Sequence, residues 1–175
     1  RLFVALDQDL VTCVHKENLM FVAFFLERAQ HLLHIVKCLV RPHIETENDL
    51  VYITARRELD YDTLFEAYYE EADALIEGGV DALLIETIFD TLNAKVAIDA
   101  SLHAMQQRGR KVLLMLSMTV SDLAGRTLSG QTIEAFLASI SPYPIFSVGL
   151  NCSFGATQMI PYLRLMARKA PYYIS

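Results

Sequence analysis

From residue 60 to the end of the sequence, helix patterns and short apolar strand patterns alternate four times. The first helix begins at Asp60 or Asp62, stops at Gly78-Gly79, and leads into the strand pattern Val80–Ile85. Helix-to-strand units in a row imply parallel strands that are joined by right-handed crossovers. The sequence therefore predicts an α/β fold, either part of an eight-stranded (β/α)8 TIM-type barrel or an open doubly wound sheet.

The other expected elements follow the same rule, because each strand pattern is short and apolar, as in a buried parallel strand. They are helices 91–107, 131–140 and 156–169 and strands 111–117, 145–150 and 172–175. No Gly-x-Gly-x-x-Gly or Walker sequence follows any of these strands. Its absence argues against the nucleotide-binding kind of doubly wound sheet.

Residues 1–59 lack this alternation. Leu2–Leu6 and Leu50–Thr54 have the composition of short strands, and Glu17–Val40 has the apolar spacing of a largely buried helix. Arg41-Pro42 would end that helix, because proline disfavours helical backbone at the preceding residue. We expect residues 1–57 to form a mainly helical N-terminal segment without a catalytic pattern, and residues 58–175 to form the barrel-like domain.

Composition narrows the class of protein. Apolar residues make up 53% of the chain, and the formal net charge of −6 offers no basic surface for a nucleic acid. Charged residues interrupt the most apolar long stretch, 19–40, so we expect no membrane span. Three scattered cysteines are too few for a disulfide framework, which predicts a cytoplasmic protein. A chain that begins at Arg1 and ends within an apolar run favours a fragment of a longer protein.

Candidate site residues lie where the expected strands end, because the carboxyl ends of parallel strands carry the chemistry in such folds. These ends are Glu86-Thr87, Ser117-Met118-Thr119, Asn151-Cys152 and Ser175. Glu86 is the best acidic candidate, since a carboxylate there can bind the ammonium group of a substrate. The alternative is a structural carboxylate that caps the next helix or pairs with Lys95.

Cys152 is the one cysteine at an expected strand end, whereas Cys13 and Cys38 fall in the N-terminal segment. It has three candidate roles, namely a zinc ligand, a nucleophile or a buried structural thiol. A zinc site needs more ligands than one thiolate, and the sequence has no Cys-x-x-Cys or His-x-x-x-His pair. A nucleophile needs a nearby base, but no histidine lies at a strand end. Spacing alone therefore favours a buried structural thiol.

The loop Gly125–Gln131 is rich in hydrogen-bond donors and precedes an expected helix. It has the composition of a cradle for an anion at a helix N-terminus. A well-capped loop with Ser129 as the cap explains the same residues, and we favour that second interpretation.

Three stretches of sequence carry a more specific signal. They read LLIETIFDTLNAK over 83–95, AGRTLSGQTIEAF over 124–136 and VGLNCSFGA over 148–156. Together they resemble the homocysteine-binding domain of cobalamin-dependent methionine synthase, a homocysteine S-methyltransferase. The resemblance covers about residues 58–175, and it implies strands four to seven of a (β/α)8 barrel.

In that family a zinc ion held by three cysteine thiolates binds homocysteine and lowers the pKa of its thiol. The resemblance implies that Cys152 is the first zinc ligand, that Glu86 lies near the amino group of homocysteine, and that Asn151 belongs to the same substrate site. It also implies a methyl group from methylcobalamin, which is recharged by methyltetrahydrofolate, with both cofactors bound by modules of a longer polypeptide.

The sequence departs from the family in four places, one of which is the lack of a recognisable third-strand motif. The Asp-Gly-Ala-Met-Gly-Thr motif of the first strand and the Gly-Gly-Cys-Cys-Gly motif with the other two zinc ligands are absent, and Met118 replaces a common glycine. We therefore expect the isolated chain to lack methyl transfer activity. The alternatives are a methyltransferase that uses betaine or S-methylmethionine, and a non-catalytic remnant that forms an inert α/β module. Open barrel edges also predict self-association.

Overall fold

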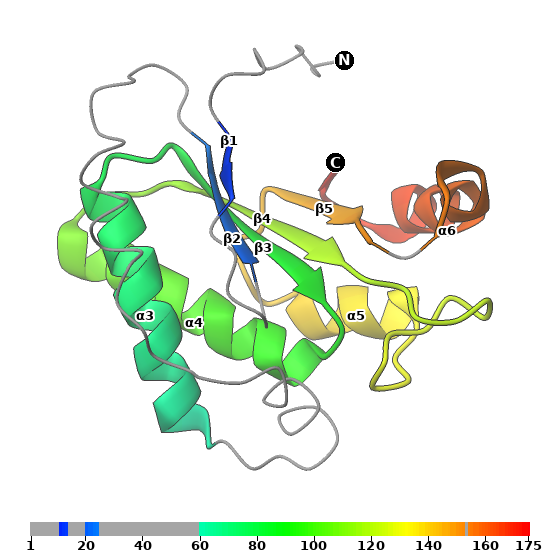
Figure 1. The fold of residues 1–175 in the computed structure, drawn as a ribbon, viewed down its shortest axis with the longest axis horizontal. Helices are drawn as coiled ribbons and strands as arrows, with labels where there is room; N and C mark the ends of the chain where they lie inside the picture. Colours follow the sequence, from blue (N-terminus) through cyan, green and yellow to red (C-terminus); the bar gives the residue numbers. More distant parts are fainter. Residues whose placement is uncertain (1–10, 14–19, 25–59, 153) are drawn as a thin grey trace.

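The computed structural model describes residues 11–13, 20–24, 60–152 and 154–175, and it describes side chains from residue 60 onward. From residue 60 onward, helices and strands alternate along the chain (Figure 1). In chain order the elements are β1 (Val11–Cys13), β2 (Met20–Phe24), α3 (Tyr61–Glu77), β3 (Ala82–Ile88), α4 (Thr91–Arg108), β4 (Leu113–Met118), α5 (Ile133–Ile140), β5 (Ser147–Leu150), α6 (Ala156–Lys169) and β6 (Tyr173–Ile174).

The strands form one six-stranded sheet in the order β1-β2-β3-β4-β5-β6. Strands β3 to β6 pair in parallel, whereas β1 and β2 pair antiparallel with each other and β2 pairs antiparallel with β3. The parallel strands lie side by side in sequence order and never reverse. A doubly wound sheet reverses its strand order at the ligand site, so this order is that of a barrel segment. The expected fold class is confirmed as a partial TIM-type barrel.

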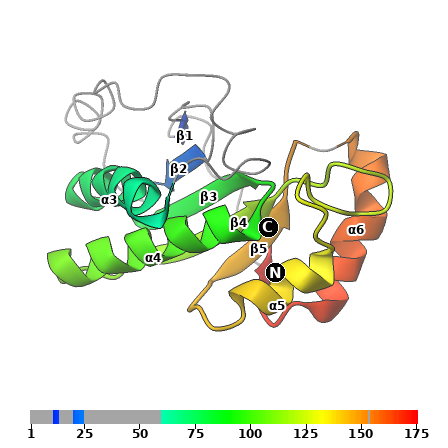
Figure 2. The ribbon, with the colours of Figure 1, turned by 90° about the horizontal axis from the view of Figure 1, so that it is seen from below.

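The core lies between the parallel strands and the helices. Figure 2 shows α4 and α5 along one face of the sheet. Strand residues that point to this face are fully or almost fully buried, among them Leu83, Ile85, Leu116 and Val148. Each buried side chain of this size contributes about 1.5–3 kcal/mol to folding. The alternate residues of β4 are more exposed, and Leu113 keeps 42% of its surface, so the two faces of the sheet differ.

Local sequence signals set the ends of the helices. Asp60 caps α3 by accepting a hydrogen bond from the Thr63 N–H, and Asp90 caps α4 by accepting from Leu92 and Asn93. Gly79, just beyond α3, has φ 94°, a left-handed conformation that glycine adopts at little cost. The predicted helices after residue 60 are confirmed, with bounds that shift by at most two residues.

The prediction for the N-terminal segment is wrong in one place. Residues 20–24, which fall within the expected helix Glu17–Val40, form strand β2. Their sequence MFVAF is a short apolar run, and such a run fits a helix or a strand equally well until a neighbouring strand is present. Here β3 supplies the hydrogen-bonding partner. The other expected elements, Leu2–Leu6 and Leu50–Thr54, lie outside the described residues.

Candidate functional site

The carboxyl ends of β3, β4 and β5 meet at one edge of the sheet. Backbone pairing places Ile88 of β3 beside Met118 of β4, and Met118 beside Leu150 of β5. The polar residues that were expected at the strand ends therefore lie close together. The described parts contain no helix long and apolar enough to cross a membrane.

Asn151, which directly follows β5, connects the ends of all three strands. Its side-chain oxygen accepts hydrogen bonds from the Thr87 N–H (3.2 Å), the Ser117 hydroxyl (2.8 Å) and the Thr119 hydroxyl (3.5 Å). Its Nδ2 donates to Thr87 Oγ1 at 2.8 Å. Ser117 and Thr119 are only 6% and 8% exposed. Asn151 is therefore a partly buried polar connector, a role that the sequence pattern did not reveal.

Two residues at this edge have left-handed backbone conformations. Thr87 has φ 64° and Cys152 has φ 55°, and no other described non-glycine residue has a positive φ. The pairing of β3 with β4 is irregular between Ile85 and Ile88, where Glu86 and Thr87 form a bulge. Left-handed backbone in a non-glycine residue costs about 1–3 kcal/mol, and such strained residues cluster at functional sites. The hydrogen bonds from Asn151 offset part of this cost at Thr87.

Glu86 lies in the bulge and is partly buried. Burial raises the pKa of its carboxyl above the usual value of 4.5, and burial is the sole cause of the shift. The cap of α4 is Asp90, and no ion pair among the described residues joins Glu86 to Lys95. Neither structural alternative for this carboxylate is therefore seen within the part of the chain that the structure describes. It is an acid at the mouth of the barrel segment with no internal partner among the described residues.

Cys152 is exposed, so the buried structural thiol favoured by spacing alone is wrong. Its place at the start of the β5–α6 connection leaves the sulfur open to solvent. The described residues contain no group of three His, Cys, Asp or Glu side chains that could hold a metal ion. A catalytic zinc needs three protein ligands. Cys152 suits a zinc ligand by its chemistry, but the described residues do not form a complete zinc site.

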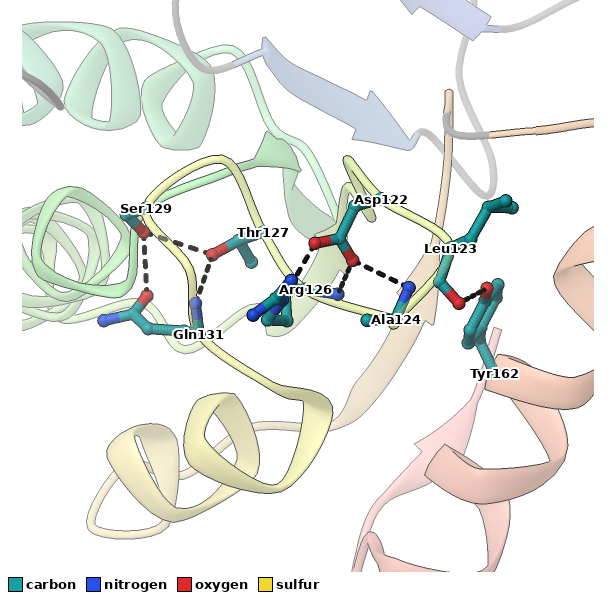
Figure 3. A network of polar contacts seen from close by, with 8 residues as sticks. All are labelled: Asp122, Leu123, Ala124, Arg126, Thr127, Ser129, Gln131 and Tyr162. Carbon is teal, nitrogen blue, oxygen red and sulfur yellow. Dashed lines mark hydrogen bonds and ion pairs between the residues drawn. The ribbon is translucent and has the colours of Figure 1, made fainter.

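The donors of the 122–131 loop bond to the protein itself (Figure 3). The Asp122 carboxylate accepts from the backbone N–H groups of Ala124 and Arg126 and from Arg126 Nε. These contacts hold the pKa of Asp122 below its usual value, the backbone bond to Arg126 acting most strongly. The favoured interpretation of a structured loop thus agrees with the geometry, because the loop's backbone N–H groups at Ala124 and Arg126 and the Arg126 Nε bond within the loop itself.

Ser129 is not the cap of the following helix, contrary to prediction. Thr132 caps α5 by accepting from the Ala135 N–H, while the Ser129 hydroxyl donates to Phe89 O at 2.8 Å. Gln131 Oε1 accepts from the Thr91 N–H at the start of α4. Tyr162 of α6 donates to Leu123 O on the other side of the loop. The loop is therefore fastened to α4 and to α6 beside the strand ends.

The strand order, the outer helices and the polar groups at the carboxyl edge define an α/β barrel segment with its candidate site at the barrel mouth. The family model for homocysteine S-methyltransferases matches residues 20–175. This chain belongs to the homocysteine S-methyltransferase family. The match begins at residue 20 and so includes residues ahead of the three resembling motifs.

A solved structure has the same fold. The apo form of the homocysteine methyltransferase MmuM from Escherichia coli is similar, with a TM-score of 0.54 and 18% sequence identity. The likeness covers 67% of this chain and 42% of that chain. The chain thus spans less than half the length of the related structure, and at this identity the likeness establishes the fold.

Proposed function

We propose that this chain is part of a zinc-dependent homocysteine S-methyltransferase, which transfers a methyl group to the sulfur of homocysteine to give methionine. The observation that carries the proposal is Glu86, a partly buried carboxylate at the carboxyl edge of β3 that has no partner among the described residues. Membership of the family supplies the substrate class.

Glu86 has the properties of a group that binds an ammonium ion. A carboxylate in a partly desolvated position interacts strongly with a cation that enters beside it. The ammonium group of homocysteine would offset the desolvation that now raises the pKa of Glu86. Asn151 fixes the turn that presents Glu86, so its contribution to the substrate site is made at least partly through Thr87.

Cys152 would supply one thiolate to the zinc ion, with the other protein ligands coming from outside the described residues. The sequence has two further cysteines, Cys13 and Cys38, and neither belongs to a motif that matches the family's zinc ligands. Bound zinc lowers the pKa of a coordinated thiol. We propose that the chain alone binds zinc weakly and transfers no methyl group.

The methyl donor is proposed from the resemblance of the three sequence motifs. It is methylcobalamin, recharged by methyltetrahydrofolate, with both bound by other modules of a longer polypeptide. Betaine and S-methylmethionine remain the alternative donors, since homocysteine methyltransferases share the substrate site that this chain contains in part.

A binding experiment with a ligand analogue that lacks the amino group tests the role of Glu86. Titrate the chain with homocysteine and with 4-mercaptobutyrate, which lacks the amino group, and follow binding by NMR. We expect the wild-type chain to prefer homocysteine by about tenfold, the size of one charge-assisted hydrogen bond, and Glu86→Gln to lose the preference. Glu70→Gln, an exposed carboxylate on α3, is the matched control. Equal binding of the two ligands by the wild-type chain would contradict the proposal.

Zinc binding is tested separately. We expect no stoichiometric, tight zinc complex of the chain in the presence or absence of homocysteine, measured by calorimetry and metal analysis. One equivalent of zinc held with sub-micromolar affinity and released by Cys152→Ala would show that the chain has a complete site, and the proposed inactivity of the isolated chain would then be wrong.

A further inference from the structure

We propose that Asn151 is a positioning residue, which holds the Glu86–Thr87 bulge in its left-handed conformation and thereby sets the direction of the Glu86 carboxylate. The inference deepens the proposed function and rests on it for the identity of the ligand. Asn151 acts through Thr87 and need not touch the substrate.

The two hydrogen bonds between Asn151 and Thr87 fix both the backbone and the side chain of that residue. Asn151 Oδ1 accepts from the Thr87 N–H at 3.2 Å, and Asn151 Nδ2 donates to Thr87 Oγ1 at 2.8 Å. A planar amide with two contacts on one residue leaves little freedom to rotate. Thr87 is β-branched, and such a residue strongly disfavours the φ of 64° that it has here.

The other contacts of Asn151 make it a rigid anchor. Ser117 and Thr119, at the end of β4, donate to the same oxygen, and both are buried. The Asn151 N–H donates to Met118 O at 3.1 Å. The contacts with β4 fix the amide independently of Thr87, so the conformation of the bulge follows from the position of the amide.

The bulge decides where the Glu86 carboxylate points. A bulge turns the side chains of its strand, because one extra residue interrupts the alternation between the two faces. Glu86 directly precedes Thr87, so release of Thr87 to ordinary extended backbone would rotate the intervening peptide and redirect the carboxylate. Thr87 is thus the link between the asparagine and the acid.

The test uses a double-mutant cycle in the full chain. Asn151→Ala removes both bonds, and Thr87→Val removes the bond to the hydroxyl while the β-branched shape is kept. We expect Asn151→Ala to weaken homocysteine binding at least tenfold and to shift the pH titration of the Glu86 carboxyl, followed by ¹³C NMR. We expect the double variant to bind homocysteine no more weakly than Asn151→Ala alone, because both substitutions break the same connection between residues 151 and 87.

Thr132→Ala is the matched control, because it removes the capping hydrogen bond of α5 and leaves the bulge untouched. It should lower the unfolding midpoint and leave the Glu86 titration unchanged. If Asn151→Ala fails to fold, Thr87→Val provides the same readouts without adding a charge near Glu86. An unchanged Glu86 titration and unchanged backbone signals of residues 86–88 in a folded Asn151 variant would overturn the proposal.

Failure of the proposed function gives a different result. A wild-type chain that does not bind homocysteine would contradict the proposed substrate, but the Glu86 titration would still report on Asn151. A shift in that titration on Asn151→Ala supports positioning whether or not homocysteine binds, and no shift overturns it.

Discussion

Asn151 and Thr87 form a two-point hydrogen-bonded pair across 64 residues of sequence, and β4 lies between the strands that carry them. Neighbouring strands are about 4.8 Å apart, so two strands that flank a third are about 9.6 Å apart in a flat sheet. A direct contact over the end of β4 fits a sheet that curves at its carboxyl edge. The contact between Asn151 and Thr87 therefore indicates that the sheet curves as in a barrel. The same contact also arranges the polar groups of the candidate site.

Glu86→Gln should not destabilise the chain at neutral pH. Burial raises the folded-state pKa of Glu86, so the folded state holds its proton more tightly than the unfolded state. Stability from this group is complete below the ordinary value of 4.5 and is lost as the pH rises through the folded-state pKa. We expect the glutamine variant to be at least as stable as wild type at pH 7 and the two to converge at low pH. Urea denaturation at several pH values measures the unfolding free energy of the variant and of wild type. A glutamine variant that is clearly less stable than wild type at pH 7 would contradict the prediction.

Tyr68→Phe should destabilise the chain by about 1–3 kcal/mol, because it leaves a buried acceptor unpaired. The Tyr68 hydroxyl donates to Asn93 Oδ1 at 2.8 Å, and both residues are buried, at 7% and 3% exposure. Urea denaturation at pH 8 measures the difference. Tyr69→Phe, on the same helix and less buried, is the control.

The buried Tyr68 hydroxyl should also make the stability of the chain depend on pH. Burial raises its pKa above the ordinary 10.0, so the stability it contributes is complete below that value and falls as the pH rises towards the folded-state pKa. The phenylalanine variant lacks this proton. The difference in unfolding free energy between this variant and wild type should shrink above pH 10. A difference that is constant with pH would show that the Tyr68 hydroxyl is not deeply buried.

Gly149→Ala should displace the edge strand β6. A Cβ at residue 149 would lie 2.7 Å from Ser175 Oγ and closer still to the Ser175 carbonyl oxygen. Overpacking of this kind costs about 1–3 kcal/mol. Hydrogen exchange should accelerate at the Ser175 N–H, which donates to Val148 O. Gly155→Ala is the control, because its nearest neighbouring atom would be 3.9 Å away. Equal exchange in both variants would contradict the close approach of the two strands.

Asp122→Ala should loosen the 122–131 loop without unfolding the domain. The variant loses the acceptor for the N–H groups of Ala124 and Arg126, so both amides should exchange faster with solvent. The lowered pKa of Asp122 predicts the same loosening in wild type as the pH falls from 3.8 through the folded-state value. Asp62→Ala in the first turn of α3 should leave these amides unaffected. Protection that persists in Asp122→Ala would show that the carboxylate does not hold the loop.

The sequence by itself determined the alternating elements from residue 60 onward, since caps, helical periodicity and short apolar runs are local signals. It also placed Glu86, Asn151 and Cys152 at strand ends and pointed to the family that the comparison with known proteins established. The tertiary structure decided what depends on pairing between distant segments. Strand β2 forms because β3 offers a hydrogen-bonding edge, and Thr132 replaces Ser129 as the cap because Ser129 bonds to Phe89. The left-handed turn at Thr87 has no local signal, because threonine disfavours it and its two side-chain contacts among the described residues come from the amide of Asn151, brought from the end of β5.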